Sequence, residues 1–550
     1  MHNQNENKVL AMYDVRGIQN YIYKTSKLQD AIGASAIVEN IIDRALKAAK
    51  DEYEFQTHST LSCSFEWVTK DGIIIPYDEA DDKDITVLYT GGGNSFISYK
   101  SEDLCININK KMSRYVLENT YSLQLAIAYV DRSSNYRCDY DKVQNEMFKI
   151  KSNMKEARPL GALPIMKVEG LSGFPLNADV PESLRQDDYR SLESYKKKEA
   201  EKSDEERKKL DEIAKQFDSY TVNKGEDSVL AVVHIDGNNM GLRIKSILSN
   251  QDNYNKAVNA MRKLSYNINN SYKQVFDEVM NSFNHNGTKQ SDNPEEYNIL
   301  KVLVAGDDIT YVCKAKCALP SVKLFADKIS KNVMFGDKTE DNLNKYGFSV
   351  CAGISFIRSH FPFWIAYNVA ESCCDSAKKK AKKKENMLKL SDNTYKVGNW
   401  VDFHVCKNIQ AGDLETVREN EYKNLLIRPY NLMLFDNQKS DSLDTYESLI
   451  NNIVYFNNDS NIPRSFAKDI RNAYSIGESA TEQVNAFITS RGKKLPDAES
   501  TNDNKMYIEI KKDNESIEKI AKWYDALEIM DLYDSSWENT DNSSKSAKEK

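Results

Sequence analysis

Two groups of acidic residues follow apolar, strand-like runs. Asp236 ends the run that starts VLAVVHI, and Asp307 and Asp308 follow the run ILKVLVA after a single glycine, Gly306. Clustered carboxylates repel each other and favour a bound cation. Their hard oxygen atoms suit Mg²⁺ or Mn²⁺. Two such ions, about 3.5–4 Å apart, can activate an attacking hydroxyl and stabilise a leaving phosphate. These residues therefore predict a site for metal-assisted chemistry on phosphates.

Two further residues fit this chemistry. Gly306 lets the backbone approach triphosphate oxygens closely. Lys378 lies in a helix expected after Pro362, where it could hold a triphosphate as a point charge. The outer lysines of the run 378–384 could attract RNA or nucleotide. Two alternatives stay open, because a Gly-Asp-Asp hairpin also occurs as a simple turn and lysines also end helices for dipole reasons alone.

The elements that must position these residues occur twice along the chain. Each copy shows the order strand, helix, hairpin, helix, strand, which is the split βαβ or ferredoxin-like motif. The expected elements are 8–14, 28–53, 86–100, 105–121 and 123–130 in the first copy, and 228–236, 257–283, 299–314, 321–335 and 348–357 in the second. The hairpins align without gaps, 88–94 on 302–308, and Asp14 then falls opposite Asp236.

We therefore predict an α+β fold with two ferredoxin-like domains in tandem, a helical connector and a helical C-terminal domain. The length of 550 residues agrees with several domains. The expected domains are 1–135 (first palm-like domain), 136–226 (connector, partly helical and charged), 227–408 (second palm domain) and 409–550 (helical domain with a frayed tail). In this motif the first strand and the hairpin strands are neighbours, so Asp236, Asp307 and Asp308 should converge at one sheet edge.

Composition restricts the partners and the compartment. The net charge is −8, so any contact with nucleic acid must come from a local basic patch. No apolar run approaches the ~20 residues that span a bilayer, and the N-terminal residues lack the layout of a signal peptide. The nine cysteines form no Cys-x-x-Cys pair, which favours free thiols. We expect a cytoplasmic protein that does not bind membranes.

The motifs resemble those of the large subunit of type III CRISPR effector complexes, the CRISPR polymerase. In the second copy the similar segments are HIDGNNMG, AGDD and CAGI, followed by H-x-P and the AK at the helix end. In the first copy they are YDVRGIQNYIYKTSKLQDAIGAS and YTGGGNSF. The resemblance covers roughly residues 8–130 and 227–408, with a helical C-terminal region in the expected place.

This resemblance implies a nucleotidyltransferase that condenses ATP into cyclic oligoadenylates, second messengers of antiviral defence. Each palm would help bind one ATP, and a 3′-hydroxyl would attack an α-phosphate with the help of two Mg²⁺ or Mn²⁺ ions. Asp236 and Asp307 would be metal ligands, Asp308 a ligand or close support, and Lys378 a phosphate contact. The residues expected to line the first nucleotide pocket are Gly91, Gly92, Gly93 and Asn94. Implied partners are nucleoside triphosphates, RNA or a guide-RNA effector complex, and a downstream effector that the product activates.

The sequence departs from the family pattern at several places. Ala305 stands where the family has the first glycine of Gly-Gly-Asp-Asp, and Asn238 where it has a second acid. No His-Asp dipeptide occurs, so we expect no nuclease domain, and the zinc-binding cysteines between the palms are missing. This suggests a shortened or stand-alone relative.

Two alternative functions stay open. Ala305 and Asn238 favour a non-catalytic palm scaffold that binds nucleotide or RNA in a ribonucleoprotein. The palm is also shared with mononucleotide and dinucleotide cyclases, but the tandem, unequal palms argue against that function.

Overall fold

The computed structural model describes most of the chain. The described residues are 8–23, 28–91, 93–155, 163–170, 173–176, 191–198, 229–249, 251, 253–285, 298–331, 347–358, 361–390, 395–408, 413–435, 442–496, 506–511 and 517–539. They fall into two compact units, described separately below. The first unit comprises residues within 1–215, 239–274 and 301–309, and the second comprises residues within 216–238, 275–300 and 310–550.

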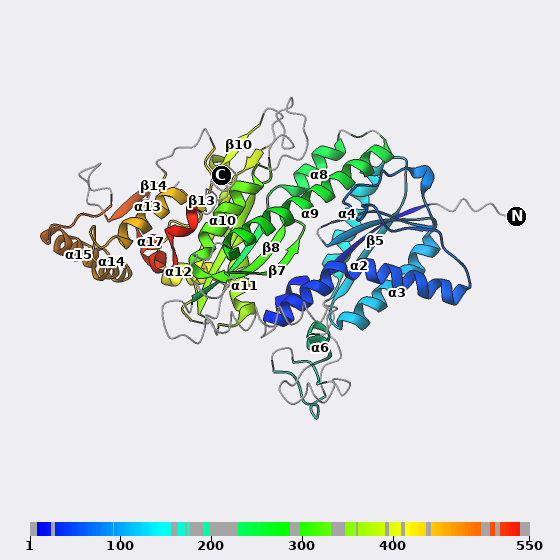
Figure 1. The fold of residues 1–550 in the computed structure, drawn as a ribbon, viewed down its shortest axis with the longest axis horizontal. Coiled ribbons are helices and arrows are strands. Elements are labelled where there is room, and N and C mark those ends of the chain that lie inside the picture. The colour runs from blue at the N-terminus through cyan, green and yellow to red at the C-terminus, as the bar shows by residue number, and fades with distance from the viewer. Residues whose placement is uncertain are drawn as a thin grey trace, which may run out of the picture. The chain divides into compact units, whose positions relative to one another are not determined.

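A five-stranded sheet forms the centre of the first unit, with the strand order β2-β3-β4-β1-β5 (Figure 1). Its strands are β1 (Val9–Arg16), β2 (Cys63–Ser64), β3 (Ile85–Gly91), β4 (Asn94–Tyr99) and β5 (Gln124–Asp131). The helices of this part of the chain are α1 (Ile18–Tyr23), α2 (Leu28–Thr57), η1 (Glu79–Asp81), α3 (Glu102–Thr120), α4 (Tyr136–Asn153), α6 (Leu192–Lys198) and α8 (Met240–Ser249). The order β3-β4-β1-β5 is that of a ferredoxin-like sheet, as predicted for the first copy.

Packing on this sheet follows from its alternating apolar side chains. Val9, Leu10 and Ala11 in β1 are completely buried. Helices α2 and α3 pack against each other, and α3 also contacts β1, β4 and β5. Helix α4 contacts β5 and β1, although its sequence was assigned to the connector. Of that connector, 136–226, the described parts are α4 and the short stretches 154–155, 163–170, 173–176, 191 and α6.

A six-stranded sheet, in the order β13-β12-β9-β6-β8-β7, is the main sheet of the second half of the chain. Its strands are β6 (Val229–Gly237), β7 (Ile299–Ala305), β8 (Asp308–Lys314), β9 (Val350–Arg358), β12 (Trp400–Val405) and β13 (Tyr430–Asn431). The order β7-β8-β6-β9 repeats that of the first sheet, so the predicted tandem of ferredoxin-like palms is confirmed. Strands β12 and β13 extend the second sheet beyond the predicted strands, and β12 runs parallel to β9.

The helices that lie between strands of this sheet along the chain include α9 (Tyr254–His285), α10 (Ala315–Ile329) and α11 (Phe363–Ala381). Helix α11 lies against β9, β12 and β6. Gly353 in β9 makes this close approach possible, because a Cβ there would lie 1.9 Å from the carbonyl oxygen of Ala370. A short 3-10 helix, η3 (Lys384–Asn386), leads into a small hairpin of β10 (Met387–Lys389) and β11 (Tyr395–Val397).

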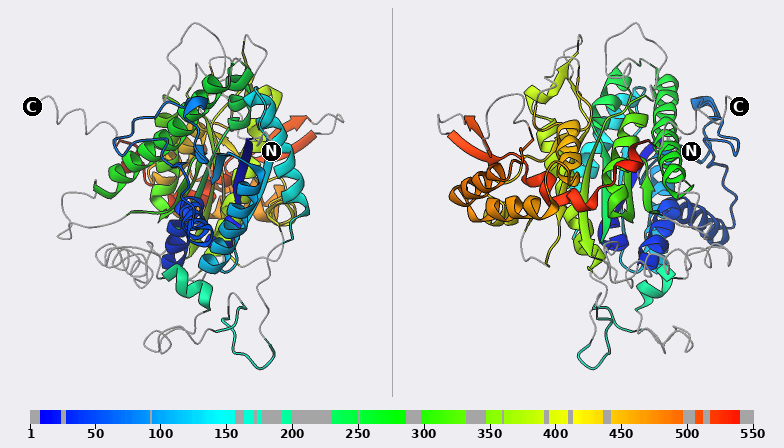
Figure 2. Two further views of the ribbon diagram at one scale, coloured as in Figure 1. Left: turned by 90° about the vertical axis from the view of Figure 1, so that its right-hand side faces the viewer. Right: turned by 60° about the vertical axis from the view of Figure 1, so that its left-hand side comes forward.

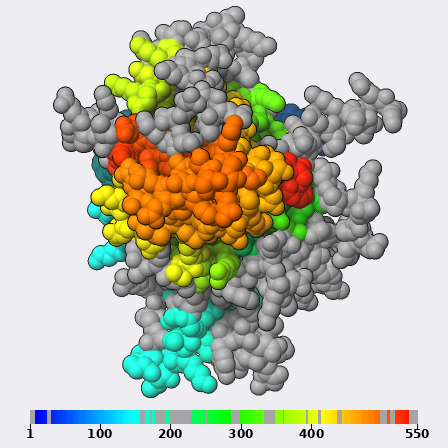
Figure 3. Space-filling view, turned by 90° about the vertical axis from the view of Figure 1, so that its left-hand side faces the viewer, coloured from blue at the N-terminus to red at the C-terminus, as the bar shows by residue number. Residues whose placement is uncertain are grey.

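The C-terminal region is mainly helical, as predicted (Figures 1 and 2). Its helices are α12 (Leu414–Glu421), α13 (Tyr446–Asn457), α14 (Arg464–Ile476), α15 (Glu478–Ser490), α17 (Tyr524–Ile529), η4 (Met530–Leu532) and η5 (Ser535–Asn539). Figure 3 shows α14 and α15, in orange, at the surface of this unit. The region also holds a hairpin of β14 (Tyr507–Lys511) and β15 (Ile517–Ala521), where the sequence predicts helix.

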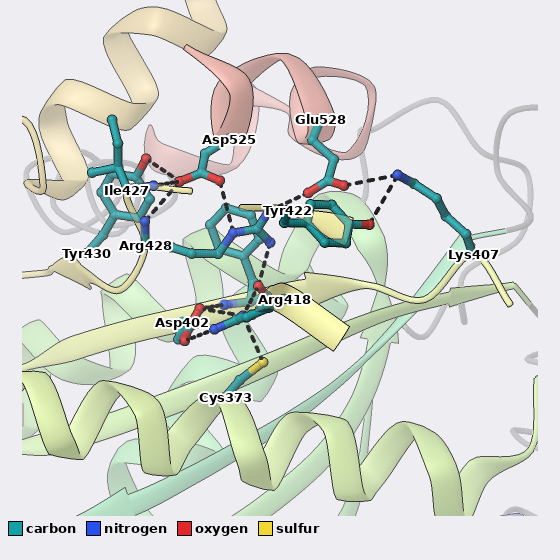
Figure 4. Close-up of polar contacts among 11 residues, drawn as sticks. Cys373, Asp402, Lys407, Arg418, Tyr422, Ile427, Arg428, Tyr430, Asp525 and Glu528 are labelled. Carbon is teal, nitrogen blue, oxygen red and sulfur yellow. Dashed lines mark hydrogen bonds and ion pairs between the residues drawn. The ribbon is translucent and has the colours of Figure 1, made fainter. Parts of the chain in front are cut away.

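Buried charges attach helix α17 to strand β12 (Figure 4). Arg428, completely buried, donates to Asp525 (2.9 Å), to Glu528 (2.5 Å) and to the carbonyl oxygen of Phe403 (2.5 Å). Arg418 pairs with Asp402 of β12, with a nitrogen–oxygen distance of 2.7 Å. The C-terminal helices are therefore fastened to the sheet by ion pairs as well as by apolar contacts.

Candidate functional site

A cavity of about 570 Å³ lies in the first unit, within the usual size range of small-molecule sites. All its lining residues belong to that unit. Six of the nine predicted site residues line it, namely Gly91, Gly93, Asn94, Gly306, Asp307 and Asp308. Gly92 lies outside the described residues. The sequence alignment shows only that the two hairpin tips are equivalent. The structure places both of them at one cavity.

Both hairpin tips depend on glycine. In the first hairpin Gly91 pairs with Asn94, and Gly93 has a positive φ of 79°. In the second, Gly306 and Asp307 join β7 to β8, and Gly306 has a φ of 65°. Only glycine adopts this conformation without strain. Ala305, half-buried, ends β7 and lines the cavity.

Helix α9 holds the first hairpin in place. Ser265 donates a hydrogen bond to the carbonyl oxygen of Thr90. Arg262 donates to the carbonyl oxygens of Leu88 (2.6 Å) and Val87 (3.0 Å), beside a register shift in β3. Strand carbonyls at such an irregularity need another donor. A Cβ on Gly91 would lie 2.3 Å from the hydroxyl oxygen of Ser265, so a side chain here would displace this hydroxyl from Thr90.

The cavity walls supply groups that suit a nucleotide. Trp67 is half-buried, and its indole nitrogen donates to the hydroxyl of Thr90 at 3.3 Å. Aromatic faces stack on bases, and Asn269 and Tyr266, both on α9, also line the cavity. Lys47 of α2 adds a cation, beside the acids Glu39, Asp43 and Glu66. Sequence reasoning missed these residues, because they come from a loop and from helices with no local motif.

Asp236 and Lys378 form an ion pair in the second unit. Asp236 is the last residue but one of β6, and the ammonium of Lys378, on α11, donates to its carboxylate. Burial lowers the pKa of Lys378, but the charge of Asp236, the nearby Cys374 and the hydrogen bond to Asp236 outweigh this effect and raise it above its ordinary value. The predicted phosphate contact of Lys378 stays a prediction.

His234 and Tyr367 show which face of the sheet this ion pair occupies. His234 lies two residues before Asp236, so both side chains point to the same face. Its ring packs edge-on against Tyr367 of α11, with centroids 5.5 Å apart, and its Nδ1 lies 3.2 Å from the hydroxyl of Thr310 in β8. Asp236 therefore faces α11.

Asn238, the second departure from the family pattern, is almost completely buried. Its backbone N–H donates to the carbonyl oxygen of Ser349 (2.8 Å). Its side-chain amide donates to the carbonyl oxygen of Gly398 (3.2 Å) and to the sulfur of Cys351 (3.4 Å). An ionised Asp could donate none of the side-chain bonds, so the amide serves the packing of β6 against the segment before β12.

The other lysines at the end of α11 are partly engaged by acids. Lys380 pairs with Asp444 at 2.7 Å and lies over the ring of Trp400. Lys379 lies 3.7 Å from a carboxylate oxygen of Glu415, with both side chains exposed. Acids of the C-terminal region therefore engage part of the lysine run, which the sequence suggests could attract RNA.

The three predicted metal ligands are of a residue type that binds divalent ions, but the described residues are not arranged around a common ion position. Asp236, Asp307 and Asp308 offer the oxygen atoms that Mg²⁺ and Mn²⁺ prefer. Among the described residues, no group of three or more His, Cys, Asp or Glu side chains is placed to hold a metal ion. The carboxylate of Asp236 instead binds Lys378.

The fold and these residues define a ferredoxin-like palm. The sequence of residues 229–388 matches the family model for the second palm domain of Cas10/Cmr2. This segment holds Asp236, Asp307, Asp308 and Lys378 and is similar to that domain, which confirms the resemblance seen in the sequence. No curated protein matches the chain.

Several solved structures are similar to the chain at low identity. The Csm1–Csm4 cassette in complex with pppApA has a TM-score of 0.40 and 16% identity, over 68% of this chain and 53% of that one. Csm1 in T. onnurineus has a TM-score of 0.49 and 14% identity, over 96% and 69%. The cassette in complex with cA4 has a TM-score of 0.41 and 14% identity, over 90% and 68%. The chain thus spans about half the length of the first of these.

The described helices include none that combines the length and the apolar character needed to cross a membrane.

Proposed function

We propose that the chain is a metal-dependent nucleotidyltransferase that condenses ATP into cyclic oligoadenylates in type III CRISPR-like defence. One observation carries the proposal: the acidic turn Gly306-Asp307-Asp308 lines the same cavity as Gly91, Gly93 and Asn94. A palm that presents acids next to a glycine-rich turn can place a triphosphate beside metal ligands. The family match of residues 229–388 supports the same chemistry.

The repeat suggests how the acids are arranged. In the first sheet, Asp14 of β1 pairs directly with Asn94 of β4. Asp236 and Asp308 are the matching residues of β6 and β8, which are neighbours in the second sheet. His234 lies two residues before Asp236, and Thr310 lies two residues after Asp308. Their contact agrees with the same antiparallel register. We therefore place Asp236 opposite Asp308 on one face.

Asp236, Asp307 and Asp308 would hold the divalent ions. Bound there, the ions would neutralise the triphosphate, favour ionisation of the attacking 3′-hydroxyl and stabilise the pyrophosphate that leaves. The task of the chain itself is positioning. Gly306 lets the backbone approach the phosphates, and Lys378 would exchange its contact with Asp236 for a phosphate oxygen. In the same proposal, the product activates a separate effector, and RNA or a guide-RNA complex acts as a partner.

The test is product analysis with the purified full chain. We expect pyrophosphate and cyclic adenylates from ATP with Mg²⁺ or Mn²⁺, identified by mass spectrometry. The double variant Asp307→Asn, Asp308→Asn should lose roughly 100-fold or more in rate, because the charge-stabilising groups are gone. Asp327→Asn, which changes a half-buried acid on α10 that pairs with Lys323, should keep the activity. A wild type that forms no product from any nucleoside triphosphate, with or without RNA, would overturn the proposal.

A non-catalytic scaffold is the second candidate. The ion pair between Lys378 and Asp236 favours it, because it engages a predicted metal ligand, and so does Ala305 at the hairpin. RNA that copurifies with the chain, together with unchanged phage defence in the double Asp variant, would establish this alternative. A product of one or two nucleotides would instead indicate a mononucleotide or dinucleotide cyclase.

A further inference from the structure

The ion pair of the second palm has an equivalent in the first. The ammonium of Lys151 donates to the carboxylate of Asp14, the residue that the hairpin alignment places opposite Asp236. Lys151 lies on α4, which follows β5, just as Lys378 lies on α11, which follows β9. Each lysine is the sixteenth residue of its helix, counted from Tyr136 and Phe363.

Aromatic contacts show that the two helices cover equivalent faces. The fifth residue of each helix is a tyrosine, Tyr140 in α4 and Tyr367 in α11. Tyr140 stacks on Phe96 of β4, with centroids 5.5 Å apart. Tyr367 packs against His234 at the same distance. The repeat therefore extends from β1 to α4 and places Asp14 and Lys151 as it places Asp236 and Lys378.

The pair in the first unit lies beside the cavity. Asp14 is the direct antiparallel partner of Asn94, and Asn94 lines the cavity. Directly paired residues have their Cα atoms about 4.5–5.5 Å apart and their side chains on one face. Phe96, two residues after Asn94, contacts α4 on this same face. A phosphate held at Asn94 is therefore within reach of the lysine side chain, which is 40% exposed.

The two equivalent sets of residues differ in charge. Arg16, two residues after Asp14, donates to the carbonyl oxygens of Lys151 and Met154 at the end of α4. The first set thus has two cations and one carboxylate, with Asn94 neutral. In the second set Asn238 and Asp308 take the places of Arg16 and Asn94, which leaves one cation, Lys378, and two carboxylates. These residues alone give the first set a formal charge of +1 and the second of −1. The cavity that Asn94 lines also carries Glu39, Asp43, Glu66, Asp307 and Asp308, with Lys47 as the cation of its lining.

A triphosphate in a cavity lined mainly by acids needs cations beside it, and Lys151 is placed to supply one. We propose that Lys151 binds the triphosphate of the nucleotide in the first palm, in place of its contact with Asp14. The inference rests on the proposed function, because it assigns a phosphate contact to the same nucleotide site. Lys151 is a binding residue in this proposal, and Arg16 positions it by capping the end of α4.

The experiment measures binding of the α,β-methylene analogue of ATP, which cannot be condensed, to the full chain with Mg²⁺, by calorimetry. Lys151→Met should weaken binding roughly tenfold or more, because a charge-assisted hydrogen bond to phosphate is lost. Lys149→Met is the matched control, since this lysine is exposed on the same helix and pairs with Glu146. Equal melting temperatures would show that both variants are folded.

A second variant separates a phosphate contact from a structural ion pair. Asp14→Asn removes the internal competitor of the phosphate, so it should leave affinity unchanged or raise it. If Lys151→Met binds as tightly as Lys149→Met, if Asp14→Asn weakens binding as much as Lys151→Met, or if the wild type does not bind the analogue, the inference is wrong. Binding of the analogue requires no turnover, so these outcomes are independent of whether ATP is converted to product.

Discussion

Asn238 shows how a departure from a motif can have a structural cause. The family pattern suggests an acid at this position, and the sequence alone left open whether the amide weakens metal binding. The buried side chain donates to the carbonyl oxygen of Gly398 and lies against Cys351. A donor is therefore needed here, and the amide supplies it.

We expect Asn238→Asp to destabilise the chain by roughly 2–4 kcal/mol, because a buried carboxylate would face the carbonyl oxygen of Gly398. The measurement is urea unfolding at neutral pH. Asn368→Asp makes the same change on the exposed side of α11 and should cost less than about 0.5 kcal/mol. Equal midpoints for the two variants would contradict the structural role of the amide.

The site residues that could be predicted are those with a local signature. Asp236, Gly306 and Asp307 stand out because acids and glycine follow apolar strand-like runs. Trp67 and Lys151 do not, because a single aromatic in a loop or one lysine in a charged helix has no pattern of its own. Their proposed roles depend on contacts with residues far away in the chain, Thr90 and Asp14.

At the scale of elements, the attachment of α17 to β12 depends on Arg428 (Figure 4). Its guanidinium is completely buried between Asp525 and Glu528. Burial lowers the pKa of Arg428, but the charges of Asp525, Glu528 and Asp402 raise it by a larger amount. The pKa therefore lies above its ordinary value. Both acids would be left without their main cation if this side chain were neutral.

Arg428→Met should therefore lower the free energy of unfolding by about 3–5 kcal/mol, the usual cost of breaking a buried ion pair from one side. Arg464→Met removes a half-exposed arginine that pairs with Asp531 at 2.7 Å, and should cost about 1 kcal/mol or less. Chemical unfolding of both variants checks this. A loss of less than 1 kcal/mol for Arg428→Met would show that the network contributes little to stability.

The elements with strong periodicity were predicted from sequence, and short ones were not. The long helices α2 and α9 were expected, because their apolar residues recur at helical spacing over many turns. The segment Ile517–Ala521 also has apolar residues at helical spacing, but it forms β15. Its pairing with Tyr507–Lys511 decides the conformation, because tertiary contacts override the weak preference of five residues.

For the whole molecule, the duplication of the palm allows the two copies to carry different residues at equivalent positions. The sequence revealed the repeat through the hairpins, whose glycines and acids align without gaps. It did not reveal that α4 belongs to the repeat, because Tyr140 and Lys151 match Tyr367 and Lys378 in a segment where few other residues agree. The predicted domain boundaries at 135, 226 and 408 stay predictions.

Two buried histidines give the chain a sensitivity to acid. Burial, together with the charge of Lys378, lowers the pKa of His234 to about 4 against a smaller opposing effect of Asp375. Burial and the charges of Arg428 and Arg418 lower the pKa of His404 to about 3. An unfolded chain binds protons at histidine near pH 6.5. Between these values the unfolded state holds more protons, so stability rises with pH in this range.

We therefore expect stability to be complete above about pH 7 and to fall as the pH drops from 6.5 towards 4, by up to about 1.4 kcal/mol per pH unit for each histidine. Urea unfolding at pH 5, 6 and 7 measures the slope. His234→Gln and His404→Gln should each reduce the slope by up to about 1.4 kcal/mol per pH unit, the contribution of one proton, because glutamine does not titrate. His58→Gln, at an exposed position, should leave the slope unchanged. If the two buried variants keep the slope of the wild type, acid acts on the molecule through its carboxylates and not through these histidines.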